Sequence, residues 1–233
     1  MKELRNKKAR KSESVGTQSI SKQALMRLPV YLNYLKSLPV GAPVNISATA
    51  IAEALHLHDV QVRKDLAVVS SGGRPKVGYV TQNLIHDLEQ FLGYDNTDHA
   101  VVVGAGNLGR ALLLYDGFQT FGLKIVAAFD RDEALIGQTI GDKCVFPVEK
   151  LENLCERLKI RIGIITVPAA AAQSVCDALI RGGVLAIWNF APTHLNVPKG
   201  VLVQNENMAA SLAMLSKHLS EQIHREADVA GRI

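Results

Sequence analysis

A glycine-rich segment between a predicted strand and a predicted helix constrains this chain more than any other feature. The apolar run of residues 100–103 leads into Gly104-x-Gly106-x-x-Gly109, and a helical pattern follows. In such a segment the first glycine makes a tight turn, the second lets the backbone approach a pyrophosphate, and the third lets the helix pack closely on the strand. The unpaired N–H groups at the start of the helix favour an anion. The segment therefore predicts a dinucleotide-binding α/β domain.

An acidic residue at the end of the next predicted strand narrows the choice of dinucleotide. Asp130 lies 21 residues beyond Gly109, and a carboxylate at this position accepts hydrogen bonds from both hydroxyl groups of a ribose. It would repel a 2′-phosphate, so NAD(H) is expected to be preferred over NADP(H), although Arg131 weakens this preference. The predicted cofactor-binding residues are Gly104, Ala105, Gly106, Asn107, Leu108, Gly109, Asp130, Arg131, Tyr115, Thr166, Val167, Pro168 and Asn189.

Predicted strands alternate with predicted helices from residue 99 onward, as a parallel α/β sheet requires. Six strands are enough for one complete doubly wound sheet, the Rossmann arrangement, and no room remains for a separate catalytic domain. We assign residues 98–205 to this Rossmann domain. The expected strands are residues 100–103, 123–129, 144–146, 162–167, 184–188 and 201–203.

A last amphipathic helix is assigned to residues 207–227. Its apolar residues recur at spacings of three, four and four, which places them on one face: Leu212, Leu215, Leu219 and Ile223. Amphipathic helices usually bury such a stripe within their own domain. The periodicity alone therefore favours packing on the protein's own sheet, and crossing to a partner chain is the alternative.

The N-terminal part of the chain differs in charge from the rest. Residues 1–76 contain 13 Lys and Arg against 5 Asp and Glu, whereas the remaining residues contain 13 and 17. A basic N-terminal part followed by an acidic remainder indicates that only the N-terminal part binds a polyanion. Residues 1–19 lack apolar periodicity and are expected to form a mobile basic arm.

Three helices are predicted after this arm. The first starts at Ser21, is started or kinked by Pro29, and has an apolar face of Leu25, Leu28, Leu32 and Leu35. Ser47 is the expected N-cap of the second helix, residues 48–55, and Asp59 is the expected cap of the third, which ends at Val69. Its buried stripe is expected to be Val62, Leu66 and Val69. Two short helices joined by a tight turn are typical of a helix-turn-helix.

The glycine-rich residues 70–79 follow the third helix and predict a basic hairpin, the wing of a winged helix. A linker helix is expected over residues 81–92. Residues 20–92 are therefore assigned to a winged helix-turn-helix domain that binds double-stranded DNA. The predicted DNA-binding residues are Gln61, Arg63, Lys64, Arg74, Lys76 and Ser47.

A catalytic group is missing from the sequence pattern. None of the five tyrosines is followed four residues later by Lys, the pair that short-chain dehydrogenases need. His194 is the best isolated acid or base, but no carboxylate partner lies near it in the sequence. His56 and His58 lie two residues apart with no third metal ligand nearby. We predict no catalytic and no metal-binding residue.

The cysteines and the apolar runs indicate in which cellular compartment the chain is expected. Cys144, Cys155 and Cys176 are odd in number and never in C-x-x-C spacing, which predicts buried thiols rather than a disulfide framework or a zinc site. The longest apolar runs are far below the roughly 18 residues that span a bilayer. No signal peptide is visible. We expect a cytoplasmic protein without membrane contact.

Several motifs, taken in order, resemble the Rex family of redox-sensing transcriptional repressors over residues 20–225. They are Val62-Arg-Lys-Asp-Leu66, Val77-Gly-Tyr79, the 104–109 loop, Phe129-Asp130, Thr166-Val-Pro168 with Ala172-Gln173, and Asn189-Phe-Ala-Pro192. The resemblance implies a winged-helix domain joined to a Rossmann domain, a homodimer that exchanges its last helix, and DNA release when NADH binds. It matches Arg63, Lys64 and Gln61 to the family's recognition helix and Tyr115 to a tyrosine near the nicotinamide.

Two departures from the family pattern bear on function. Many members have an aromatic wing of the form Tyr-Phe-Gly-x-Phe-Gly, where this chain has Val69-Ser-Ser-Gly-Gly-Arg74. Many have Glu-Asn-Val-Asp-Leu after the last strand, where this chain has Glu206-Asn-Met-Ala-Ala210. Ala209 cannot make the cross-subunit hydrogen bond of that Asp. This change bears on the strength and direction of the NADH response.

The expected function is thus a homodimeric repressor that binds an inverted-repeat operator and is released by NADH, so that it senses the NADH/NAD⁺ ratio. An NAD-dependent dehydrogenase with a basic accessory domain is the main alternative. A DNA-binding protein that senses another nucleotide, such as ADP or coenzyme A, is a third.

Overall fold

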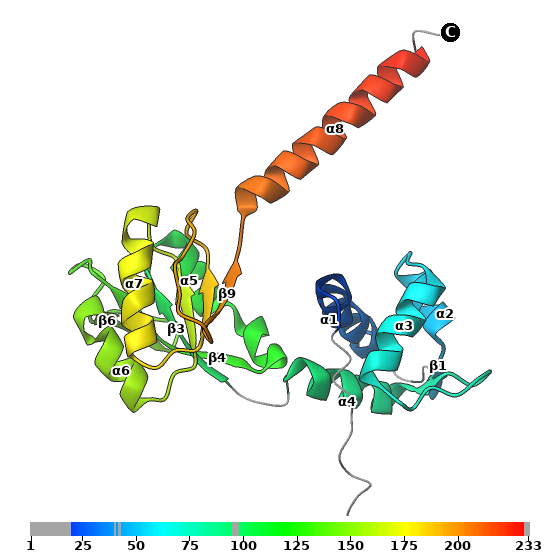
Figure 1. The fold of residues 1–233 in the computed structure, drawn as a ribbon, viewed down its shortest axis with the longest axis horizontal. Coiled ribbons are helices and arrows are strands. Elements are labelled where there is room, and N and C mark those ends of the chain that lie inside the picture. Colours follow the sequence, from blue (N-terminus) through cyan, green and yellow to red (C-terminus); the bar gives the residue numbers. More distant parts are fainter. Residues whose placement is uncertain (1–19, 40, 42, 95–97, 231–233) are drawn as a thin grey trace, which may run out of the picture. The chain divides into compact units, whose positions relative to one another are not determined.

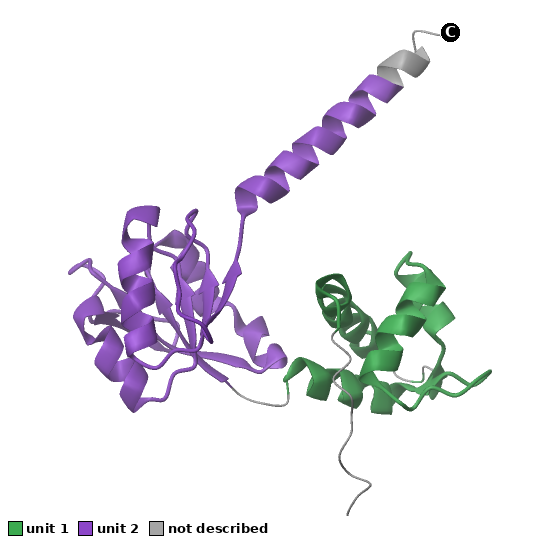
Figure 2. Cartoon of the chain, in the orientation of Figure 1, with its two compact units in different colours: residues 1–95 green, residues 96–233 purple. Residues whose placement is uncertain are grey.

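A computed structural model describes residues 20–39, 41, 43–94 and 98–230 (Figure 1). The expected N-terminal arm, residues 1–19, lies outside the described residues. The chain divides into two compact units, residues 1–95 and 96–233 (Figure 2). Each unit has a hydrophobic core of its own. No described helix is long and apolar enough to cross a membrane.

The first unit is built from four helices and a small sheet. The helices are α1 (Lys22–Lys36), α2 (Ala48–Ala54), α3 (Asp59–Val69) and α4 (Thr81–Leu92). The strands β1 (Asn45–Ile46) and β2 (Tyr79–Val80) pair antiparallel. An isolated bridge between Arg74 and Gly78 closes the wing. Two short helices in sequence followed by this hairpin make a winged helix-turn-helix, as the sequence predicts.

Local signals explain the helix starts, with one exception. The hydroxyls of Ser21 and Ser47 accept hydrogen bonds from the N–H groups of Ala24 and Ala50, so both serines are N-caps. The prediction that Asp59 caps α3 is wrong. His58 occupies the cap position without a side-chain hydrogen bond, and Asp59 is the first helical residue.

In the first unit, the buried faces of α1 and α3 differ in part from those expected. Leu28, Leu32 and Leu35 are buried as expected, but Leu25 is 43% exposed and Tyr31 is buried instead. A face with Leu25 and a face with Tyr31 both fit the helical spacing of three and four residues. Hydrophobic periodicity therefore could not decide which of the two residues is buried. On α3, Val62 and Leu66 are buried, Val69 is half-buried, and the charged Asp65 lies in the core. Pro29 lies inside α1 and neither starts nor ends it.

The second unit is a sheet with helices on both faces. Its strand order is β5-β6-β4-β3-β7-β8-β9. The strands are β3 (Asp98–Val103), β4 (Leu123–Asp130), β5 (Thr139–Ile140), β6 (Lys143–Pro147), β7 (Ile162–Ile165), β8 (Ala186–Asn189) and β9 (Leu202–Asn205). The six expected strands are parallel and follow the doubly wound order. The expectation omitted β5, which pairs antiparallel with β6 at the edge.

Alternation along β3 shows how the layers form. Val101 and Val103 pack in one cluster with residues of α6 (Leu151–Arg157) and α7 (Ala169–Arg181), whereas Ala100 and Val102 pack in another with Leu113. Leu113 belongs to α5 (Asn107–Leu114). Because successive strand residues point to opposite faces, α5 covers one face of the sheet and α6 and α7 cover the other. Two 3₁₀ turns, η1 (Asp116–Phe121) and η2 (Val148–Lys150), complete the unit.

The last helix, α8 (Met208–Ala230), overturns the expectation from periodicity. All four residues of its apolar stripe are between 55% and 65% exposed: Leu212, Leu215, Leu219 and Ile223. The helix therefore does not bury this stripe on its own sheet. A surface of this kind is normally covered by a partner.

The cysteines also depart from expectation in one case. Cys155 and Cys176 are buried, but Cys144 is exposed. Cys144 lies on β6 opposite Thr139, in the antiparallel pair at the edge of the sheet. The sequence pattern did not reveal this edge hairpin.

Candidate dinucleotide and nucleic-acid sites

The glycine-rich loop joins β3 to α5, and each glycine meets a different constraint. Gly104 has a φ of 102°, which side chains avoid. A Cβ on Gly109 would lie 1.8 Å from the carbonyl oxygen of Gly104, so only glycine allows α5 to approach the loop this closely. Around a Cβ on Gly106 nothing lies within 4 Å. The backbone at Gly106 therefore faces open space at the start of α5, where a pyrophosphate would fit.

Thr166 ties this loop to the neighbouring strand. Its hydroxyl lies 2.7 Å from the carbonyl oxygen of Gly104 and 3.1 Å from that of Val103. Val167 follows, and Pro168 occupies the cap position of α7. These residues lie at the carboxyl end of β7, beside β3, where the strand order reverses. Ligands of doubly wound sheets bind at this point.

Asp130 holds the loop from the other side. Its Oδ2 accepts a hydrogen bond from the N–H of Ala105 at 2.6 Å, and its Oδ1 accepts from the N–H groups of Arg131 and Asp132 at 2.7 and 3.0 Å. A cavity of about 640 Å³ adjoins it, lined by Gly106, Asp130, Arg131, Asp132, Glu133 and Leu135. Three carboxylates against one guanidinium disfavour a 2′-phosphate here.

Asn189 is fully buried and belongs to an internal network. Its Nδ2 lies 2.8 to 3.2 Å from oxygen atoms of Asn205, Thr193 and Ala191, and its Oδ1 accepts from the N–H of Ala191 at 3.0 Å. A direct contact with a dinucleotide would have to break these bonds. Asn189 is therefore placed to hold the loop after β8.

A row of aromatic rings starts at Tyr115, which is 55% exposed and follows α5 rather than lying within it. The ring centroids are 4.8 Å apart for Tyr115 and Phe118, 5.7 Å for Phe118 and Trp188, and 4.9 Å for Trp188 and Phe190. Trp188 Nε1 donates to Glu206 Oε1 at 2.8 Å. Sequence reasoning selected Tyr115 alone, because nothing in the spacing reveals that these rings are neighbours.

A second cavity, of about 550 Å³, lies where β9 leads into α8. His194 and Ala209 both line it, and Glu206 is the one acidic side chain among its lining residues. That carboxylate already accepts from Trp188. Within the described part of the chain, no three His, Cys, Asp or Glu side chains gather as a metal site would need.

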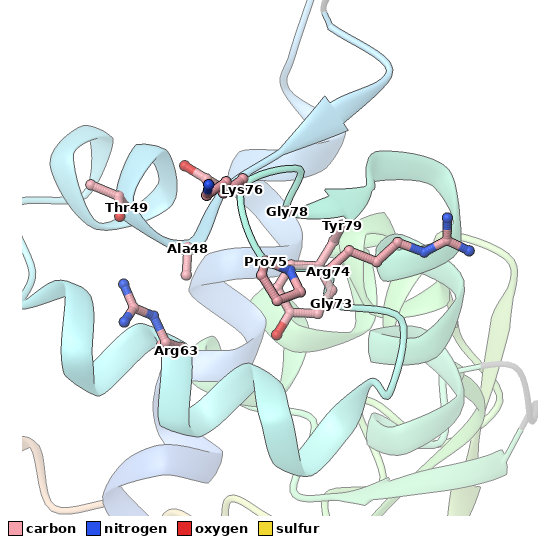
Figure 3. A pocket seen from close by; sticks show the side chains of 10 residues that line it. Ala48, Thr49, Arg63, Gly73, Arg74, Pro75, Lys76, Gly78 and Tyr79 are labelled. Atoms are coloured by element: carbon pink, nitrogen blue, oxygen red, sulfur yellow. The ribbon is translucent and has the colours of Figure 1, made fainter.

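The first unit carries a basic depression of about 550 Å³, which we call the wing groove. Its lining includes four predicted DNA-binding residues, from the start of α2, from α3 and from the wing: Ser47, Arg63, Arg74 and Lys76. Figure 3 shows Arg63 extending from α3 toward Ala48 and Thr49, while Arg74 points away from Arg63. Arg63 Nη2 lies 3.2 Å from Asp59 Oδ2, one turn earlier on α3.

The other two predicted DNA-binding residues lie outside the lining of the wing groove. Lys64 is exposed on the next position of α3, and Gln61 is half-buried. Both nonetheless lie on α3, the predicted recognition helix. A helix in the major groove contacts DNA along more than one row of side chains.

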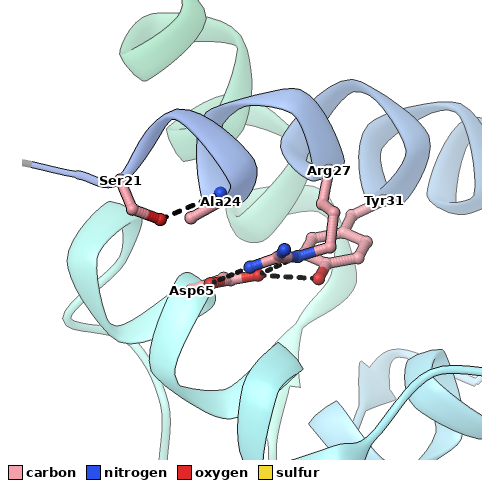
Figure 4. A network of polar contacts seen from close by, with 5 residues as sticks. All are labelled: Ser21, Ala24, Arg27, Tyr31 and Asp65. Carbon is pink, nitrogen blue, oxygen red and sulfur yellow. Dashed lines mark hydrogen bonds and ion pairs between the residues drawn. The ribbon is translucent and has the colours of Figure 1, made fainter.

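A buried polar network behind α3 was missed by sequence reasoning (Figure 4). Arg27 Nε and Nη2 donate to the two oxygens of Asp65 at 2.8 and 3.0 Å, and the hydroxyl of Tyr31 donates to Asp65 Oδ2 at 2.8 Å. Burial, with the carboxylate next to the hydroxyl, raises the pKa of Tyr31 to about 12. The usable signal was an acidic residue within the apolar stripe of α3.

Comparison with known proteins agrees with this two-part construction. A family model described as "CoA binding domain" matches residues 95–193, and one described as "Putative DNA-binding protein N-terminus" matches residues 19–67. The redox-sensing transcriptional repressor Rex of Treponema denticola is 43% identical over 192 residues, which is 82% of this chain and 91% of the relative. The Rex repressor of Porphyromonas gingivalis is 40% identical over 196 residues, 84% of this chain and 90% of the relative.

Solved structures agree with the sequence relatives. The crystal structure of RSP in complex with β-NAD⁺ and operator DNA matches with a TM-score of 0.83 at 35% identity, covering 89% of this chain and 96% of RSP. The structure of RSP with β-NADH matches with a TM-score of 0.79 at 34% identity, over 90% and 98%. RSP is described as a Rex-family repressor. Because the likeness includes both the winged-helix unit and the dinucleotide-binding unit, this chain belongs to the Rex family of redox-sensing transcriptional repressors.

Proposed function

We propose that this chain is a repressor that binds operator DNA as a homodimer and releases it when NADH binds, so that it reports the NADH/NAD⁺ ratio. One observation carries the proposal: a basic wing groove and a dinucleotide loop occur in a single chain, on a fold shared with RSP, which has been crystallised with β-NAD⁺ and operator DNA.

On the DNA side, Arg63, Arg74, Lys76 and Ser47 of the wing groove attract and position phosphates, together with Lys64. The basic residues make the affinity fall steeply with salt, because bound cations leave the DNA when the protein binds. Base edges are read from α3, by Gln61 and Arg63. This division assigns positioning mainly to the wing groove and specificity mainly to the recognition helix.

On the dinucleotide side, the residues of the loop fit the group they are proposed to hold. The open backbone at Gly106 and the start of α5 receive the pyrophosphate, and Asp130 receives the ribose hydroxyls. Tyr115 lies near the nicotinamide ring, whose positive charge in NAD⁺ is lost in NADH. An apolar, water-poor pocket between the two subunits of the dimer favours the neutral ring. Each tenfold preference for one conformation requires about 1.4 kcal/mol of differential binding.

The homodimer follows from α8, whose apolar stripe is exposed in the single chain. We propose that residues 207–227 are exchanged between two subunits, with residues 20–92 as DNA-binding domains and residues 98–205 as dinucleotide-binding domains. Two identical DNA-binding domains related by two-fold symmetry match the two halves of an inverted repeat. We propose a cytoplasmic regulator rather than an enzyme.

A dinucleotide titration of the protein–DNA complex tests the proposal. In a gel-shift assay, micromolar NADH is expected to release the DNA and NAD⁺ to act much more weakly. Equal effects of both would contradict redox sensing. Dissociation constants for NADH measured with and without operator must change by the same factor as the DNA affinity does, since the coupling is reciprocal.

Two competing functions can be tested with the same protein preparation. Turnover of NAD⁺ with a panel of alcohols and hydroxy acids would indicate a dehydrogenase. Coenzyme A and ADP belong in the titration, because the family model that matches residues 95–193 is described as a CoA binding domain. If either compound released the DNA at a lower concentration than NADH does, the protein would sense that nucleotide rather than the redox state.

A further inference from the structure

The buried network behind α3 reaches one of the residues predicted to read DNA. With its amide oxygen toward α1, Gln61 accepts hydrogen bonds from Arg27 Nη1 at 2.8 Å and from Nη2 at 3.1 Å. In the reverse orientation its NH₂ group would face a guanidinium, which has no acceptor. Hydrogen bonding thus assigns the oxygen of Gln61 to Arg27.

Arg27 is itself held in place. Its guanidinium forms a two-point pair with the carboxylate of Asp65, which is 6% exposed and also accepts from Tyr31. Such two-point, charge-assisted pairs fix orientation as well as distance. Turning Arg27 away from Gln61 would break this pair and leave a buried charge without its partner, which is costly. The oxygen of Gln61 therefore stays engaged.

We propose that Arg27, held by Asp65, sets the hydrogen-bonding polarity of Gln61, so that this side chain presents only its NH₂ donors to the major groove. Glutamine ordinarily recognises adenine by using its oxygen and its NH₂ group together, on N6 and N7. Without the oxygen, Gln61 matches guanine, whose N7 and O6 are both acceptors. Adenine offers only one acceptor, N7, and its N6–H₂ group opposes the second donor. Arg27 and Asp65 are thus positioning residues for base recognition, and the inference rests on the proposed role of α3 in reading operator DNA.

A purely structural role for the network predicts something different. If Arg27 and Asp65 only fasten α1 to α3, their loss lowers stability and weakens binding to every sequence alike. If they set the polarity of Gln61, their loss changes the preferred base at one position. Base preference is therefore the measurement that separates the two roles.

The experiment starts with selection of duplexes from a random pool by the full-length wild-type protein. Enrichment of no sequence would reject the proposed function itself, independently of this inference. The Gln61→Ala variant then identifies the operator position at which discrimination is lost. At that position the wild type is expected to favour guanine over adenine about tenfold or more, the discrimination typical of one good base contact.

The decisive variant is Arg27→Met combined with Asp65→Asn. It removes both charges together and so avoids an unpaired buried charge. It frees the oxygen of Gln61, and adenine is expected to become equal to or better than guanine at that position alone. Lys36→Met is the matched control, since it removes a cation and an ion pair with Glu89 from the same helix without touching Gln61. It is expected to keep the wild-type preference.

Gln61→Glu gives a second test that leaves Arg27 and Asp65 intact. The new carboxylate accepts from Arg27 but has no NH₂ donors, so the preference for guanine is expected to disappear. Three results would overturn the inference: a wild-type preference for adenine, an unchanged preference in both test variants, or no position affected by Gln61→Ala. Circular dichroism confirms that each variant is folded.

Discussion

Asp130 shows how one carboxylate can serve both the protein and its ligand. Its oxygens accept from the N–H groups of Ala105, Arg131 and Asp132, which connects the glycine loop to the end of β4. Ribose hydroxyls that reach this carboxylate would share the same acceptors. We therefore expect this residue to combine loop geometry with cofactor selection.

Replacement of Asp130 by Ala is expected to weaken NADH binding at least tenfold, because hydrogen bonds to a charged group contribute about 1.5–3 kcal/mol. DNA binding should be unchanged, and NADH should no longer release the DNA. Isothermal titration with NADH and a gel shift check the two expectations. Asp142→Ala removes a carboxylate outside the lining of the cavity beside Asp130 and serves as control. Loss of DNA binding in Asp130→Ala would contradict the separation of the two functions.

The three thiols differ at the same scale. Burial raises the pKa of Cys155 and of Cys176 to about 11, above the ordinary value, so both stay protonated at pH 8. Cys144 is exposed. A thiol reagent at pH 8 is therefore expected to modify one cysteine in the native protein and three after unfolding in denaturant. Mass spectrometry identifies the site, and the Cys144→Ser variant should show no fast reaction. Rapid modification of Cys155 in the native state would contradict the assigned burial.

At the scale of elements, α3 presents two different faces. Its inner face carries Val62, Leu66 and Asp65 into the core, and its outer face carries Arg63 and Lys64. Hydrophobic spacing predicted the buried Val62 and Leu66 and the end of the helix at Val69. The buried Asp65 and the missing cap at His58 could not be predicted, because each depends on a partner or a backbone conformation set elsewhere in the fold.

The recognition helix makes a specific prediction about salt. Lys64→Ala is expected to weaken binding to all DNA sequences and to reduce the slope of log affinity against log salt by about one, the effect of one lost phosphate contact. NADH affinity should not change. Fluorescence anisotropy at several salt concentrations measures the slope, and Lys150→Ala in the second unit is the control. An unchanged slope would remove Lys64 from the DNA interface.

At the scale of the whole molecule, α8 ties the function to assembly. All four residues of its apolar stripe are more than half exposed in the single chain. Two winged-helix domains can bind one inverted repeat together only in a stable dimer. This stripe, which lies outside the winged-helix unit, is therefore expected to control DNA binding by holding the dimer together.

Replacement of Leu215 and Leu219 together by Asp is expected to raise the dimer dissociation constant more than 100-fold, because burying one leucine contributes about 1.5–3 kcal/mol. Sedimentation velocity measures the dimer, and operator binding should fall with it. Lys217→Asp, which lies off the stripe, should leave the dimer intact. A double variant that remains dimeric at low micromolar concentration would exclude α8 as the dimer contact.

Much of this protein was determined by local sequence pattern. The strand–loop–helix around Gly104, Gly106 and Gly109, the alternation of strands and helices, the Ser47 cap and the span of α4 all follow from short-range rules of turn, cap and periodicity. Tertiary structure alone decided the edge strand β5, the aromatic row from Tyr115 to Phe190, the buried Arg27–Asp65 pair and the exposed stripe of α8. These features join residues that lie far apart in sequence or leave a surface without an internal partner, and neither spacing nor composition encodes such distances.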